Sequence, residues 1–157
     1  MAAVTEITWK GLPALKLANG SGASCTITPY GAHLVQWTDA SGKELLFVSS
    51  IAEGGGGKAI RGGVPICWPQ FAAKGPYAKH GFCRNSAEWT VVRTSTEPYP
   101  CVVLGLVDSA TSKAQFPSPF ALRYSVTLDS EASVSTSLTV MNTSPDQPLE
   151  FTTALHT

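Results

Sequence analysis

Two arginines in a glycine-rich part of the chain are the first candidates for chemistry. Arg61 is followed by two glycines, and Arg84 comes three residues after Gly81. Glycines let a ligand approach the backbone closely. A guanidinium group stays charged at physiological pH and binds phosphate through two parallel hydrogen bonds. The pair therefore predicts a clamp for a phosphate group, with two purely structural arginines as the alternative.

The three histidines are candidates for proton transfer, because histidine titrates near neutral pH. His80 lies between Lys79 and Gly81 at the edge of the glycine-rich part, and His156 ends an apolar run. Residue type alone explains them equally well as structural groups: a core histidine at position 156 and an ordinary strand residue at His33. Because they lie far apart in sequence, nothing local supports a zinc site.

Several common site motifs are absent from the sequence. Gly57-Lys58 follows a run of glycines, but Ala59 stands where a phosphate loop needs Ser or Thr, and Ala52 stands where it needs its first glycine. There is no dinucleotide fingerprint and no G-x-S-x-G elbow. No pair of carboxylates is marked out for a glycosidase. These classes of enzyme therefore gain no support.

The composition indicates a folded protein without a strong overall charge. Apolar residues make up 43% of the chain, charged residues 14%, and the formal net charge is zero. We therefore expect neither nucleic acid nor a membrane as a partner. MAAVTEITWK is not typical of a signal peptide, so we expect a cytoplasmic protein. The cysteines, at positions 25, 67, 83 and 101, form no C-x-x-C pair and are expected to be free thiols.

Alternation of apolar and polar residues predicts an all-β chain. It is clearest at 120–129 and 134–140, which we expect to pair as a hairpin with a turn at 129–131. Further strands are predicted at 14–18, 24–28, 33–38, 44–48, 88–93, 101–107 and 150–156. No long amphipathic helix is predicted. This pattern favours an antiparallel β-sandwich over a closed barrel.

Residues 49–84 form a long connection without alternation. Long connections in compact domains are usually functional or disordered. This one contains Trp68, Phe71, Tyr77 and Phe82, which favours an ordered, functional loop. We expect one domain, 1–157. Because the chain stops one residue after His156, within a predicted strand, we expect its C-terminal part to be missing and its open strand edges to lower stability.

Short sequence elements resemble those of one known family, the hexose-6-phosphate mutarotases (glucose-6-phosphate 1-epimerases) of the aldose 1-epimerase superfamily. The elements are GAHLVQW, AIRGGVPICWPQF, HGFCRNSAEW, ALRYSVTL, VMNTS and FTTALHT. They follow the family's order and cover nearly the whole chain, as the N-terminal half of such an enzyme. The resemblance implies a galactose mutarotase-like β-sandwich.

The resemblance also implies roles for individual residues. Arg61 and Arg84 would bind the phosphate of the substrate. Lys79 replaces a commoner glutamine and would still be able to contact phosphate. His80 would line the sugar pocket, and His156 matches the histidine that acts as general acid.

The implied reaction interconverts the α and β anomers of aldohexose 6-phosphates. A general acid protonates the ring oxygen while a general base deprotonates the anomeric hydroxyl, so no metal or other cofactor is needed. In this family the base is a glutamate of the second half, which this chain lacks. We therefore expect the chain alone to be a weak or inactive catalyst, and a non-catalytic sugar-phosphate-binding module is the alternative.

A mutarotase for unphosphorylated sugars is a further alternative. It is less favoured, because a neutral sugar does not need a clamp of two cations. We expect a hexose 6-phosphate as the partner and a monomeric protein.

Overall fold

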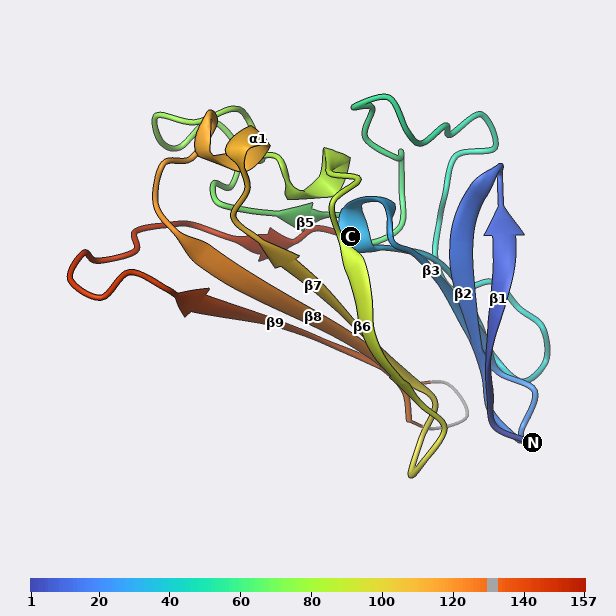
Figure 1. The fold of residues 1–157 in the computed structure, drawn as a ribbon. Helices are drawn as coiled ribbons and strands as arrows, with labels where there is room; N and C mark the ends of the chain where they lie inside the picture. Colours follow the sequence, from blue (N-terminus) through green and yellow to red (C-terminus); the bar gives the residue numbers. More distant parts are fainter. Residues whose placement is uncertain (130–132) are drawn as a thin grey trace.

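The chain folds into two four-stranded antiparallel sheets that face each other (Figure 1). The computed structural model describes residues 1–129 and 133–157. The first sheet contains β1 (Ala3–Trp9), β2 (Leu12–Ala18), β3 (Ser24–Thr28) and β4 (His33–Thr38), and the second contains β6 (Thr90–Ser95), β7 (Cys101–Val107), β8 (Phe120–Leu128) and β9 (Val134–Asn142). In both sheets, strands that neighbour in sequence also pair. The predicted all-β, antiparallel class is confirmed.

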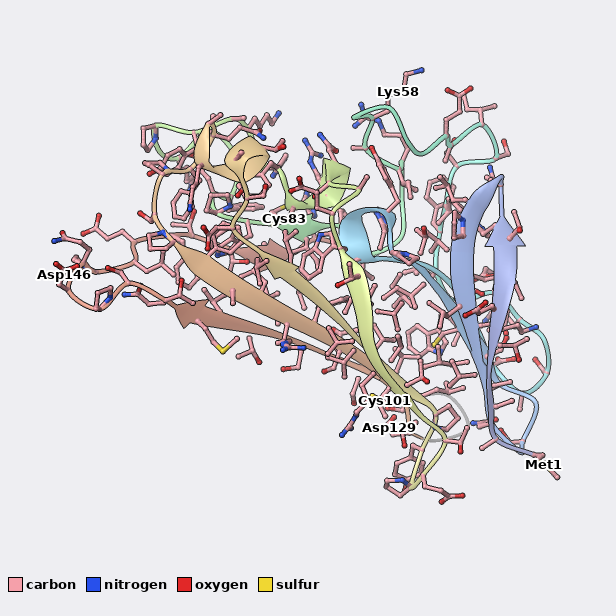
Figure 2. All side chains as sticks on the ribbon, viewed as in Figure 1. Met1, Lys58, Cys83, Cys101, Asp129 and Asp146 are labelled. Atoms are coloured by element: carbon pink, nitrogen blue, oxygen red, sulfur yellow. The ribbon has the colours of Figure 1, made fainter. Side chains whose placement is uncertain are left out.

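One apolar core joins the two sheets. On β8 every second residue is buried, from Phe120 through Tyr124 to Leu128, as the alternation predicts. These side chains form one cluster with Leu17 and Ile27 of the first sheet. Side chains fill the space between the sheets (Figure 2). Burying each large apolar side chain contributes about 1.5–3 kcal/mol, so this shared core holds the sheets together.

A smaller set of elements covers the end where the sheets diverge (Figure 1). It comprises the two-stranded sheet of β5 (Ile66–Cys67) and β10 (Ala154–Leu155), two 3₁₀ turns, η1 (Tyr30–Ala32) and η2 (Cys83–Asn85), and the short helix α1 (Ala110–Lys113). Trp68, directly after β5, is fully buried against aromatic rings from Phe82, Phe116 and Phe120. This packing ties the glycine-rich connection to the core, so the predicted order of that connection agrees with the structure.

Most predicted strands are present, but several segments differ from the prediction. The strand β1 was not predicted, because its half-exposed edge shows only weak alternation. The strand predicted at 88–93 begins and ends two residues later, as β6. The strand predicted at 44–48 is wrong: Glu44 bridges Thr38, whereas Val48 bridges Gly62. This segment changes partner within four residues and so never runs along one neighbour.

The strand predicted at 150–156 is also largely wrong. Only Ala154 and Leu155 pair with β5. Prolines at positions 65 and 69 flank the partner strand and accept hydrogen bonds from His156 and Thr152, both at 3.0 Å. Proline has no N–H to donate in return, so the ladder cannot extend. The turn predicted at 129–131 falls mainly on residues outside the described part of the chain.

Two smaller expectations can be compared with the described residues. All four cysteines are free thiols, as predicted. None of the described helices is long and apolar enough to cross a bilayer.

Candidate functional site

Arg61 and Arg84 line the same cavity, which has a volume of about 470 Å³. Arg61 is exposed and Arg84 is half-buried. Lys58 and Glu53 line the same cavity, so its charged side chains sum to a net charge of +2. Lys58 forms an ion pair of 3.2 Å with Glu53 in which both side chains are largely exposed. The structure thus brings the two predicted clamp residues together in a positively charged cavity.

The backbone of Arg84 is held by η1. Gly31 has a φ of 70°, and a side chain at this position would collide with the carbonyl oxygen of Arg84. The Gly31 N–H also donates to the carbonyl of Ser86 at 2.8 Å. Only glycine combines this conformation with so close an approach. The position of Arg84 therefore depends on the tight packing of η1 against η2.

The side chain of Arg84 retains a donor for a ligand. Its Nη2 donates to the carbonyl oxygen of Lys79 at 3.4 Å. Its Nε is buried and has no hydrogen-bond partner among the described residues. A buried N–H without a partner is costly, and an acceptor atom of a ligand that reached this N–H would relieve that cost. This arrangement is what an anion-binding arginine needs.

The backbone around Arg61 is held from two sides. On one side, Ser49 donates to the carbonyl of Arg61 at 3.0 Å, and the N–H of Gly63 donates to Phe47 at 2.7 Å. On the other side, the ring of His33 lies 2.7 Å, through Nε2, from the carbonyl oxygen of Gly62. His33 is fully buried. The turn that carries Arg61 is therefore fixed by packed neighbours.

Two of the predicted site histidines lie next to each other. The ring centroids of His80 and His156 are 5.5 Å apart, and Phe71 contacts both rings, at 5.5 Å and 5.9 Å. The residues are 76 positions apart in sequence, and the β5–β10 pairing brings them together. The fold therefore creates a histidine pair with an aromatic wall.

His80 is held as a neutral donor. The N–H of Ala72 donates to its Nδ1 at 3.2 Å, and the Cys67 thiol lies 3.4 Å from the same atom. Desolvation, followed by the charges of Arg84, His156 and Lys79, lowers the pKa of His80. The proton of the neutral ring is therefore on Nε2, which is available to a ligand. Its φ of 66°, uncommon for a residue other than glycine, is typical of functional positions.

His156 is anchored through its backbone, and its side chain is exposed. Its N–H donates to the Pro65 carbonyl at 3.0 Å. Upstream, the hydroxyl of Thr153 donates to the Cys67 carbonyl at 2.9 Å, and Phe71 N–H donates to the hydroxyl of Thr152 at 2.8 Å. These contacts place the imidazole beside His80 and leave it accessible to a substrate and a proton donor.

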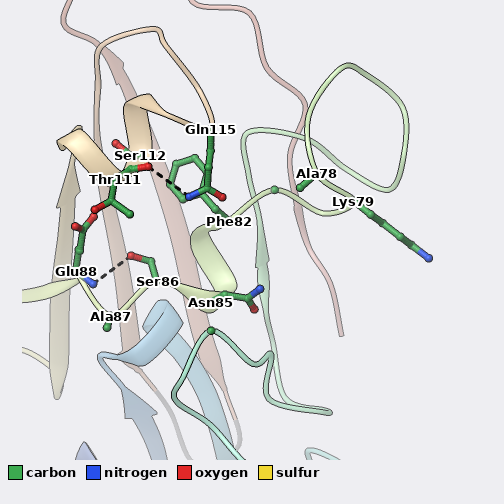
Figure 3. A pocket seen from close by; sticks show the side chains of 12 residues that line it. Ala78, Lys79, Phe82, Asn85, Ser86, Ala87, Glu88, Thr111, Ser112 and Gln115 are labelled. Atoms are coloured by element: carbon green, nitrogen blue, oxygen red, sulfur yellow. Dashed lines mark hydrogen bonds between the residues drawn. The ribbon is translucent and has the colours of Figure 1, made fainter.

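Lys79 does not share the cavity of the arginines. It lines a neighbouring cavity of about 450 Å³, whose other lining residues include Ser86, Glu88 and Gln115. In Figure 3 its side chain extends away from these residues. Gly57 and Asn85 line both cavities, so the two are adjacent. Phosphate contact by Lys79 remains a prediction, and its observed contribution is the backbone carbonyl that orients Arg84.

Phe71, Gln70 and His33 were not among the predicted site residues. The Gln70 side chain is buried and bonds the backbone of Ala72 and Tyr77 with three hydrogen bonds of 2.9–3.0 Å, which shapes the loop before His80. Nothing in the spacing of these residues indicates such contacts. In the described part of the chain, no cluster of three or more His, Cys, Asp or Glu side chains is arranged to hold a metal.

Two known structures share this fold. The provisionally assigned mutarotase YeaD of Salmonella typhimurium matches with a TM-score of 0.77 at 24% identity, over 88% of this chain and 46% of that one. A galactose mutarotase-like protein of Clostridium acetobutylicum matches with a TM-score of 0.69 at 19% identity, over 90% of this chain and 49% of that one. At these identities the comparison shows the fold: a galactose mutarotase-like β-sandwich.

Sequence comparison identifies the family. A protein of Cenchrus ciliaris, provisionally named a glucose-6-phosphate 1-epimerase, is 34% identical over 155 residues, which is 94% of this chain and 46% of that protein. An Escherichia coli K12 protein with the same provisional name is 41% identical over 96 residues, which is 59% of this chain and 32% of that protein. The chain thus spans half or less of the length of these relatives. The family model for aldose 1-epimerase matches residues 13–157, and the chain belongs to the aldose 1-epimerase family.

Proposed function

We propose that this chain carries the phosphate-binding arginines and the general acid of an enzyme that interconverts the anomers of aldohexose 6-phosphates. The observation that carries the proposal is the placement of Arg61 and Arg84 in one cavity, next to the segment that bears His80. Family membership supports an anomer interconversion, and the relatives provisionally named glucose-6-phosphate 1-epimerases support a phosphorylated sugar.

The charge of the cavity suits a sugar phosphate. A phosphate monoester carries a charge of about −1.5 to −2 at pH 7, and the charged side chains of the arginine cavity sum to +2. The planar guanidinium groups of Arg61 and Arg84 would each bind two phosphate oxygens. The Nε of Arg84, which has no partner among the described residues, would be a further donor for the anion. Binding energy from this remote phosphate would orient the sugar for reaction.

The histidine pair supports acid catalysis at the sugar ring. We propose that His156, which is exposed to the site, protonates the ring oxygen as the bond between C1 and that oxygen breaks. A base takes the proton of the anomeric hydroxyl, so an open-chain aldehyde forms without net proton change. Rotation about C1–C2 and closure on the other face, with the two protons returned, gives the other anomer. Neutral His80 would donate from Nε2 to a sugar hydroxyl.

The base is the part of this proposal that the described residues do not supply. Among the described residues, the acidic side chains in ion pairs are Glu53 with Lys58 and Asp108 with Lys113. The polar contacts of the His80 side chain are with Cys67 and Ala72 instead. By family resemblance we expect a glutamate from outside this chain. This same observation favours the second candidate function, a module that binds sugar phosphate without turnover.

Binding tests the phosphate site first. We expect the Arg61→Ala and Arg84→Ala variants to bind glucose 6-phosphate roughly 10–100-fold more weakly, the loss of a charge-assisted hydrogen bond. The matched control is Arg93→Ala, an exposed arginine on β6, which should leave affinity unchanged. Titration calorimetry with glucose 6-phosphate, glucose and inorganic phosphate measures this. Equal losses for glucose and glucose 6-phosphate would contradict a phosphate role.

Turnover then separates the two candidate functions. NMR exchange spectroscopy measures the rate of α to β interconversion of glucose 6-phosphate with and without the protein. Acceleration above the spontaneous rate supports the enzyme. Phosphate-dependent binding without acceleration supports the binding module.

A further inference from the structure

We infer that His33 is a positioning residue for the arginine pair, and that the segment from Gly31 to Leu34 sets the relative placement of Arg61 and Arg84. The inference deepens the proposed function and rests on it for its ligand. His33 lies in the first sheet, and it would act through the backbone that it holds.

The segment contacts both arginine-bearing turns. At its start, Gly31 packs against the carbonyl oxygen of Arg84 and donates to Ser86 at 2.8 Å. Two residues later, His33 meets the carbonyl of Gly62, the residue after Arg61, at 2.7 Å. Leu34 then accepts the N–H of Val64 at 3.0 Å. This short segment therefore sets the distance between the turn that carries Arg61 and the turn that carries Arg84.

The ring of His33 also occupies the space beneath the turn of Arg61. A side chain added at Gly63 would come within 2.8 Å of His33 Nε2 and would collide with the carbonyl oxygen of Leu34. Gly63 has a φ of 67°, which favours glycine. The turn is thus pressed against the imidazole with no room for a side chain between them. If His33 moves, the turn that carries Arg61 must move with it or lose its hydrogen bonds.

His33 is a buried, neutral side chain that is suited to holding the turn in one position. It is fully buried, and its Nδ1 has no partner among the described residues. Burial, opposed in part by the Gly62 bond and assisted by the charge of Arg84, lowers the pKa of His33 to about 4. The ring is therefore neutral near pH 7, and it donates from Nε2 to the Gly62 carbonyl. A neutral donor fixes the turn without adding a buried cation near the guanidinium group of Arg84.

Two substitutions distinguish the effect of the hydrogen bond of His33 from the effect of the volume of its side chain. His33→Gln places an amide N–H near the position of Nε2, whereas His33→Phe retains a ring of similar size without a donor and leaves the Gly62 carbonyl unpaired. Val126→Ala, a fully buried residue of β8 in the other sheet, controls for lost stability alone. The probes are glucose 6-phosphate, inorganic phosphate and glucose.

We expect His33→Phe to bind glucose 6-phosphate and inorganic phosphate at least about tenfold more weakly, with glucose binding unchanged and His33→Gln recovering most of the loss. Amide hydrogen exchange gives a readout without a ligand. The amides of Ser49 and Gly63, which fix the turn of Arg61, should exchange faster in His33→Phe, and at the wild-type rate in His33→Gln and Val126→Ala.

The outcomes distinguish this inference from the proposed function. Unchanged exchange at Ser49 and Gly63 in His33→Phe, or equal phosphate losses in all three variants, would overturn a positioning role. If the exchange changes as expected but the wild-type protein binds no sugar phosphate or phosphate, the function is wrong while the positioning of the Arg61 turn by His33 is supported.

Discussion

The arginine cavity and the histidine pair are built in different ways. The turn of Arg61 contacts residues 47–49 on one side and His33 and Leu34 of the first sheet on the other, and the backbone of Arg84 packs against Gly31 of η1. The histidine pair depends on a two-residue ladder between β5 and β10, extended by hydrogen bonds from Thr152 and Thr153. The proposed phosphate-binding region is thus fixed by close packing, and the proposed acid region by a few hydrogen bonds at the end of the described chain.

We expect the two regions to control different properties. A rigid anion site gains affinity because little ordering is needed when the ligand binds. A histidine held by few contacts is more readily displaced, and misplacement affects reaction rate more than binding. Changes at the arginines should therefore act mainly on affinity, and changes near His156 mainly on rate.

The largest expected effect tests whether reaction rate and phosphate affinity depend on different regions of the protein. His156→Gln removes the proposed acid and retains a polar side chain of similar reach. In any preparation that accelerates exchange, we expect the rate to fall by about 10²–10⁴-fold, the usual contribution of general acid catalysis. NMR exchange measures the rate, and calorimetry on the same variant should give unchanged affinity for glucose 6-phosphate. An equal fall in affinity would mean that the two regions are not separable.

A second effect concerns acid stability of the arginine side. The pKa of buried His33 is lowered from 6.5 to about 4, so the unfolded state binds more protons between these values. The stabilisation is complete above pH 6.5 and declines as pH falls, by about 3 kcal/mol at pH 4. Urea unfolding at pH 7 and pH 4 measures the free energy of unfolding. His33→Gln should lose about that much less between the two pH values, and parallel losses would contradict the assignment.

A third, smaller effect concerns the hydrogen bonds that hold the histidine pair in place. Thr153→Val removes the hydrogen bond to the buried Cys67 carbonyl and should destabilise the β5–β10 region by about 1 kcal/mol. The rate of anomer interconversion should fall severalfold, while the affinity for phosphate should stay unchanged. Thr38→Val, which removes a similar bond to Ser24 in the first sheet, is the matched control. A rate loss of the same size in the control would show that the ladder has no special role.

The smallest effect tests the rim of the arginine cavity. Glu53→Gln breaks the exposed ion pair with Lys58, so stability should change by no more than about 0.5 kcal/mol, because solvent screens exposed charges. Removing a negative charge from the cavity should strengthen phosphate binding slightly at low salt, and added salt should abolish the gain. Calorimetry at two salt concentrations measures both. A large stability loss would place Glu53 in the framework rather than at the rim.

Much of the sheet structure was predictable because it depends on local pattern. The strands at 24–28, 33–38 and 101–107 match β3, β4 and β7, since one buried face imposes alternation on the sequence. The segments at 44–48 and 150–156 did not follow the prediction. In the first segment the pairing partner changes midway, and in the second the prolines that flank β5 have no N–H to donate. The alternation of apolar and polar residues does not specify which strand either segment pairs with.

The candidate site divides in the same way. The residue types of Arg61, Arg84, His80 and His156, together with the order of the short sequence elements around them, indicated the family and the chemistry from the sequence itself. Only the tertiary structure decided that the two arginines share a cavity, that the two histidines are neighbours, and that His33 lies beneath the turn of Arg61. Chemical type is a property of single residues, whereas proximity across dozens of positions arises from sheet pairing and core packing, which no local pattern specifies.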